Sequence, residues 1–144
     1  NAVKPSAYFT VTQLNLQVDS FVLADTFKTV KHRQTGKKIG MPILYYRANR
    51  LKIGNNPVQS EWSNNTYNLN DYWASLLLQV NSPSGQAHPL RDSANAHLFY
   101  SRIRNPNFSN PERPYRAESF LLHSAGPDGL YGTADDVFNF DEGN

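Results

Sequence analysis

The candidate functional residues of this chain are three aspartates near the C-terminus. Asp128, Asp135 and Asp136 lie in a short stretch that also carries glycines at positions 126, 129 and 132. Calcium takes about six to eight oxygen ligands, so a site needs several carboxylates together with backbone carbonyls turned toward one point. Glycine allows the backbone conformations that turn carbonyls in this way. No Lys or Arg follows Asp128, so nothing nearby in sequence would neutralise the three carboxylates.

The same stretch also has a purely structural interpretation. Pro127-Asp128-Gly129 forms a good turn by itself, and the adjacent Asp135 and Asp136 could simply be solvated. The EF-hand pattern does not fit, because Asp128 is followed by Gly129 and Leu130 rather than by alternating acids. Spacing alone therefore leaves calcium binding and a solvated acidic turn both open.

Two blocks of the chain resemble a known family, the major pseudopilins of type II secretion and related prepilin-type proteins. The first block has a hydrophobic strand, a Ser-x-Gly-x-Asp-Gly turn, a Gly-rich spacer, an acidic pair and an aromatic, in Phe120-Leu121-Leu122-His123-Ser124-Ala125-Gly126-Pro127-Asp128-Gly129 and Gly132-Thr133-Ala134-Asp135-Asp136-Val137-Phe138-Asn139-Phe140. The second resembles the family's Asn-Pro-Ile-x-Tyr-Tyr strand, with Met41 where Asn is common, in Met41-Pro42-Ile43-Leu44-Tyr45-Tyr46-Arg47-Ala48-Asn49. Together they cover 28 of the 144 residues, about a fifth of the chain.

The resemblance implies a calcium loop and a structural role. The side-chain ligands would be Asp128, Asp135 and Asp136, with a backbone carbonyl from Ala125. The chain would be an exported bacterial protein, extracellular or periplasmic, that associates with itself and with other pilin-like subunits in a filament. The family's N-terminal hydrophobic helix is missing from this sequence. Membrane anchoring would occur only through that helix, and we expect that a segment upstream of Asn1 has been removed.

The predicted fold is α+β and pilin-like, with an N-terminal helix packed on a small antiparallel sheet. A chain of 144 residues with 39% apolar residues can bury one core, so we expect a single domain over 1–144. Apolar spacing predicts a helix over 6–24, although residues 14–18 of this segment also alternate as a strand would. It predicts a hairpin whose strands are 27–30 and 39–47 and whose turn is 35–38. Two further helices are predicted over 71–80 and 94–104, and a strand over 119–123. Pro106, Pro111 and Pro114 predict an irregular crossing before that strand.

Composition argues against catalysis. The chain contains no Cys, which excludes zinc–thiolate sites, thiol nucleophiles and disulfides. Its histidines occur singly, and no nucleophile, phosphate-loop or metalloprotease motif accompanies them, so we expect no enzyme. No stretch approaches the ~18 apolar residues of a membrane span. We also expect no nucleic-acid partner, since Arg102, Arg104, Arg113 and Arg116 are more simply solvated than gathered with Phe108 and Tyr115 into a basic aromatic patch.

Charge is divided unevenly along the chain. Up to Arg116 there are 14 Lys and Arg against six acids, a net charge of +8, and from Ala117 onward there are six acids and no Lys or Arg, a net charge of −6. This division predicts either a solvated acidic tail or pairing between subunits, with Asp141 and Glu142 facing those arginines.

A second function is also compatible with the sequence. A calcium-stabilised surface adhesin or glycan-binding module could stack sugars on Trp62, Tyr67, Tyr72 and Trp73, although core packing explains part of this set more simply.

Overall fold

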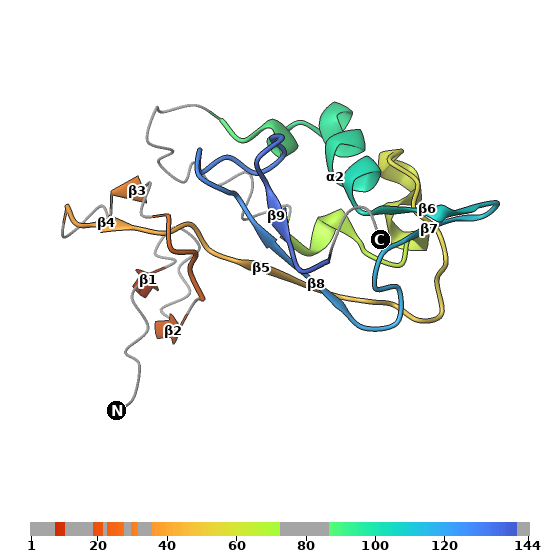
Figure 1. Ribbon diagram of the computed structural model, residues 1–144, viewed down its shortest axis with the longest axis horizontal. Helices are drawn as coiled ribbons and strands as arrows, with labels where there is room; N and C mark the ends of the chain where they lie inside the picture. The colour runs from red at the N-terminus through yellow and green to blue at the C-terminus, as the bar shows by residue number, and fades with distance from the viewer. Residues whose placement is uncertain are drawn as a thin grey trace.

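The computed structural model describes residues 8–10, 19–21, 23–27, 30–31, 36–72 and 87–140 (Figure 1). Within these ranges the chain mixes helix and sheet, which agrees with the α+β prediction at this coarse level. Two short antiparallel pairs come first: β1 (Tyr8–Thr10) with β2 (Asp19–Phe21), and β3 (Val30–Lys31) with β4 (Lys38–Ile39). The second pair confirms a hairpin at this point of the chain.

The central sheet has three antiparallel strands in the order β5 (Leu44–Arg47), β8 (Phe120–Ser124), β9 (Val137–Phe138). The register pairs Leu44 with His123 and Arg47 with Phe120. Because successive side chains of a strand point to opposite faces, β5 buries Leu44 and Tyr46 and exposes Tyr45 and Arg47. The sheet therefore has one face in the core. It also joins the two blocks on which the family resemblance rests.

Within the described residues, five helical elements lie between β5 and β6 in the chain, and all but η5 contribute buried side chains to the core. They are η2 (Gln59–Asn64), η3 (Leu69–Tyr72), η4 (Pro89–Arg91), η5 (Ser93–Asn95) and α2 (Ala96–Arg102). The Asp92 carboxylate accepts a hydrogen bond from the Ala94 amide at 2.9 Å and so begins the η5–α2 segment. Phe99 of α2 packs on Tyr46 of β5, with ring centroids 5.1 Å apart. The core thus lies between α2 and the sheet.

A hairpin of β6 (Arg104–Ser109) and β7 (Glu112–Pro114) extends at one end of the molecule (Figure 1). The predicted irregular crossing is therefore wrong. Pro106 lies in the irregular register between Asn105 and Ser109, where its missing N–H removes no regular ladder bond. An ion pair between Arg104 and Glu112, at 3.1 Å, joins the two strands.

The predicted N-terminal helix is wrong where the structure describes it. Its two ends form the paired strands β1 and β2, and positions 11–18 lie outside the described residues. The alternation at positions 14–18 lies outside the described residues, so the pairing of β1 with β2 does not test it. The helical spacing of the apolar residues is a local pattern. The pairing of β1 with β2, which local sequence does not indicate, has overridden it.

Four other predicted elements have different outcomes. The short helix over 94–104 is confirmed by η5 and α2, and the strand over 119–123 by β8. The helix over 71–80 lies outside the described residues from position 73 onward. The strand over 39–47 is interrupted, because Gly40 lies against Asp25, where an added Cβ would be 1.8 Å from the Asp25 carbonyl oxygen. Pro42 instead forms an isolated bridge with Ala24.

Candidate functional site

The acidic loop connects β8 to β9, and its two ends approach closely. Gly126 has φ +66°, and a Cβ added there would lie 2.1 Å from the Asp135 carbonyl oxygen. Only glycine tolerates both the left-handed backbone and this contact. The Gly129 amide donates to the Gly126 carbonyl at 3.2 Å and closes the turn that contains Asp128. The turn and the acidic pair are therefore brought together by backbone contacts.

Asp128 and Asp135 are neighbours in this loop. The Asp128 amide donates to Asp135 Oδ2 at 3.0 Å, and the Thr133 hydroxyl donates to Asp135 Oδ1. Partial burial raises the pKa of Asp128, and the Asp135 charge adds to this against hydrogen bonds from Leu130 and Thr133. Burial also acts to raise the pKa of Asp135, but hydrogen bonds from Thr133 and the Asp128 amide outweigh it and lower that pKa. The two carboxylates thus occupy one small polar cluster.

Asp136 points the other way, into the core. It is 5% exposed, and its Oδ2 lies 2.7 Å from His123 Nε2 and accepts a hydrogen bond from the Gly132 amide at 2.7 Å. His123, on β8, is fully buried and stacks on Phe138 of β9, with ring centroids 4.5 Å apart. This buried pair fastens the loop to the sheet. Asp136 Oδ1 lies 3.4 Å from the Thr133 hydroxyl, so one of its oxygens faces the loop cluster.

The residues fit a calcium ion only in part. Across the described ranges, no group of three or more His, Asp or Glu side chains has the arrangement of a metal site. Asp128 and Asp135 supply adjacent carboxylate oxygens, which are the donors that calcium prefers. Ala125 is fully buried where the chain leaves β8. Asp136 differs from the other two predicted calcium ligands, because its Oδ2 already accepts from the Gly132 amide and lies against His123 Nε2.

Two buried partners of this loop, His123 and Asp25, were not predicted from the sequence. His123 alternates with Leu121 on the core side of β8, and a histidine on an apolar strand face signals a buried hydrogen-bonding partner. Asp25 was likewise unassigned, yet it is buried and its Oδ2 accepts from the Ser124 hydroxyl at 2.9 Å. Its Oδ1 accepts from the Met41 amide at 3.2 Å. No local pattern around Asp25 indicates these distant contacts.

Of the four residues suggested for sugar stacking, the two whose side chains are described are buried. Trp62 is fully buried and Tyr67 is 1% exposed. The Tyr67 hydroxyl donates to the Arg116 carbonyl, and burial raises the pKa of Tyr67 well above its usual value. Nothing is described of the Tyr72 side chain, and Trp73 lies outside the described residues. The described rings therefore belong to the core.

The four arginines of the proposed subunit contact are arranged differently from one another. Arg102 donates to the Asp136 carbonyl at 3.1 Å, and Arg104 pairs with Glu112. Arg113 and Arg116 lie over aromatic rings, of Phe108 at 5.6 Å and of Phe120 at 5.5 Å. Their expected partners, Asp141 and Glu142, lie outside the described residues.

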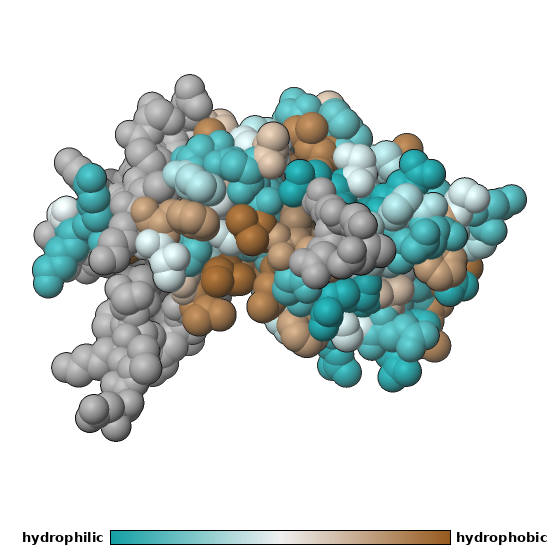
Figure 2. Space-filling view, viewed as in Figure 1, coloured by the Kyte–Doolittle hydropathy of each residue, from teal (hydrophilic) through white to brown (hydrophobic). Residues whose placement is uncertain are grey.

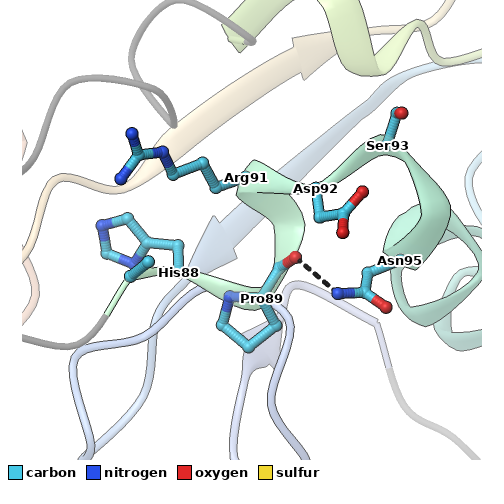
Figure 3. Close-up of a pocket in the computed structure, with 7 residues that line it drawn as sticks. His88, Pro89, Arg91, Asp92, Ser93 and Asn95 are labelled. Carbon is cyan, nitrogen blue, oxygen red and sulfur yellow. Dashed lines mark hydrogen bonds between the residues drawn. The ribbon is translucent and has the colours of Figure 1, made fainter.

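A shallow hollow lies beside η4 and η5 and is lined by polar side chains (Figure 3). Asn95 donates to the Pro89 carbonyl at 3.1 Å, and Asp92 accepts from the Ala94 amide, so both are used in local turns. His88, at the edge of the hollow, is 4% exposed. Its Nδ1 accepts a hydrogen bond from the Tyr131 amide at 3.2 Å, which links His88 to the acidic loop.

His88 should make folding sensitive to acid. The pKa of His88 is lowered from 6.5 to about 4, mainly by burial, while Asp136 acts to raise it and Arg91 and His123 act to lower it. The folded state therefore binds fewer protons than the unfolded state between these values, so stability falls as pH drops from 6.5 toward 4. With discounting for solvent screening, we expect a loss on the order of 2 kcal/mol. His88→Asn retains an acceptor near Nδ1 without a titrating ring, so urea unfolding at several pH values should show a flatter profile for this variant. Parallel profiles would contradict the assignment.

Comparison with protein-family models, with curated proteins and with solved structures finds no match for this chain. Within the described ranges, no helix combines the length and the apolar character needed to cross a bilayer. We therefore infer function from the loop, its buried partners and the resemblance of the two sequence blocks.

Proposed function

We propose that this chain is the pilin-like head of a structural subunit of an extracellular or periplasmic filament, stabilised by calcium in the loop between β8 and β9. The observation that carries the proposal is the junction of the two blocks that resemble the family. Residues 44–47 of one block form β5, which pairs directly with β8 of the other, and the acidic loop leaves β8 from the core. A subunit of this kind needs a rigid head, and the loop joins two strands of its sheet.

Asp128 and Asp135 would hold the calcium ion, together with the Ala125 carbonyl and the loop-facing oxygen of Asp136. Bound calcium supplies positive charge that offsets the repulsion of clustered carboxylates. The role of the chain itself is to position the donors, through the Gly126 backbone and the Asp136–His123 contact. The adjacent Ser124 hydroxyl is engaged by Asp25, which supports a structural role over a catalytic one.

Calcium should raise the free energy of unfolding. A metal that binds only the folded state adds about 2.7 kcal/mol when its concentration is a hundredfold above Kd, and extracellular sites are as weak as ~10⁻⁴ M. We expect a higher melting temperature in millimolar calcium than in chelator, and a smaller effect of magnesium, which requires tighter octahedral geometry. Differential scanning calorimetry measures this difference.

Asp128→Asn is the matched variant for this experiment. It keeps an oxygen that can accept from the Leu130 amide, which Asp128 Oδ1 does at 2.8 Å, but it removes the charge. The calcium effect should therefore disappear while the stability in chelator is retained. Glu118→Gln, at an exposed acid outside the loop, is the control and should respond as the parent chain does. Coincident melting curves with and without calcium would exclude the site.

The filament role has its own test. Immunogold labelling of cells that produce the natural protein should place it along surface or periplasmic fibres. Uniform labelling of the envelope with no fibres would contradict the filament role without bearing on calcium.

A further inference from the structure

The turn that follows β5 exposes three aliphatic side chains. Leu51 is 92% exposed, Ile53 51% and Val58 55%. Isolated apolar residues on a surface need no explanation, but three within eight positions form an exposed apolar segment. The Leu51 side chain makes almost no contact with the rest of the described chain, so it can be buried in a binding partner without any rearrangement of the turn.

Hydrogen bonds fix the backbone of this turn, so its exposed side chains have defined positions. The Lys52 amide donates to the Asn49 carbonyl at 3.0 Å, and the Thr66 hydroxyl donates to the Lys52 carbonyl at 2.9 Å. The Asn65 side chain accepts from the Asn56 amide and donates to the Asn56 carbonyl, both at 2.8 Å. A turn with such hydrogen bonds has already lost its conformational freedom, so binding costs less ordering entropy.

Basic residues surround the exposed aliphatic side chains. From Arg47 to Ser60 the chain has no Asp or Glu, and it carries three cations: Arg47, Arg50 and Lys52. Arg47 is exposed at the end of β5, and Arg50 is exposed within the turn. Lys52, which lies between Leu51 and Ile53 in the sequence, is half-buried. The next acid, Glu61, accepts a hydrogen bond from Asn64 at 3.0 Å. The turn is therefore positively charged as well as apolar.

The turn lies at the same end of the long axis as the β6–β7 hairpin (Figure 1). That hairpin adds Phe108, 45% exposed, with Arg113 above its ring. Figure 2 shows that this end carries mostly hydrophilic side chains with apolar ones between them, whereas apolar side chains gather over the middle of the face. Cationic and apolar side chains mixed at one protruding end match the headgroup region of a lipid bilayer.

We propose that the 49–58 turn docks this chain on an anionic lipid surface. Leu51 and Ile53 enter the boundary between headgroups and acyl chains, while Arg47, Arg50 and Lys52 stay at the phosphates, as long basic side chains do. Charge complementarity selects an anionic bilayer, and the protruding turn needs no matching groove. The inference is independent of the calcium loop and of filament formation.

Vesicle co-sedimentation of the chain in chelator tests this docking. Vesicles of phosphatidylcholine with about one third phosphatidylglycerol should bind the chain, and phosphatidylcholine alone should bind it about tenfold more weakly. Leu51→Ser with Ile53→Ser, and separately Arg50→Gln with Lys52→Gln, should each weaken binding by about tenfold. Added salt should reduce binding further. Arg50, Leu51 and Ile53 are exposed and Lys52 is half-buried, so the melting temperature should change little in either double variant.

Two control variants show whether the effect is local. Val137→Ser removes an exposed apolar residue of β9, and Lys38→Gln removes an exposed cation of β4, both outside the turn. Neither should change vesicle binding by more than about twofold. The proposal is overturned if the anionic vesicles do not bind the parent chain or bind it no better than the neutral ones. It is overturned equally if the turn variants bind like the parent, or if the controls weaken binding as much as the turn variants do.

Discussion

Asp136→Ala is expected to lower the free energy of unfolding by about 3 to 5 kcal/mol, in chelator as well as in calcium. The substitution leaves two buried groups without their acceptor, His123 Nε2 and the Gly132 amide, which both lie 2.7 Å from Asp136 Oδ2. Each unsatisfied buried polar group costs about 1 to 3 kcal/mol. Because a domain of this size is stable by about 5 to 15 kcal/mol, the loss is a large fraction of the total. Urea unfolding followed by circular dichroism measures it.

The comparison with Asp128 separates structural anchoring from metal binding. If Asp136 were only a calcium ligand, its variant would match the parent chain in chelator, as Asp128→Asn should. Asp136→Asn is a gentler variant, because an amide oxygen in place of Oδ2 can accept both hydrogen bonds, so we expect a loss of about 1 kcal/mol. Equal stability of Asp136→Ala and the parent chain in chelator would contradict the anchoring role.

Trp62→Ala is expected to cost about 3 to 5 kcal/mol, since a fully buried indole leaves a large cavity. Trp62 packs near Tyr100, with ring centroids 6.5 Å apart, and its indole N–H donates to the Pro57 carbonyl at 3.0 Å. Both the packing and the hydrogen bond are lost in the variant. Thermal unfolding of the variant should therefore begin far below that of the parent chain.

Two comparisons make this result specific to core packing. Trp62→Phe keeps most of the apolar area and should lose about 1 to 2 kcal/mol. Tyr45→Ala, at a side chain that is 48% exposed, should cost less than Trp62→Ala. A Trp62→Ala variant that keeps the parent's stability would place the ring outside the core. Reduced glycan retention in an unfolded Trp62→Ala sample would not support sugar stacking.

Some elements of the fold follow from local pattern. The strand at 120–124 and the short helix at 96–102 were predicted from apolar spacing and turn signals, and both are confirmed within a few residues. The β6–β7 hairpin was not predicted, because three prolines nearby indicated irregular chain. Proline is compatible with a strand wherever its N–H has no partner to lose, and that depends on the neighbouring strand rather than on sequence.

The composition of the acidic loop can be read without the structure: three aspartates, glycines where the backbone must turn, and no cation nearby in sequence. Tertiary structure decided which way each carboxylate points. Asp135 and Asp136 are adjacent in sequence and looked equivalent, yet Asp136 enters the core while Asp135 stays beside Asp128. The reason is the buried His123, whose ring nitrogen lies against one carboxylate oxygen, because a buried polar group must be satisfied. Only the pairing of β8 with β9 brings that partner to Asp136.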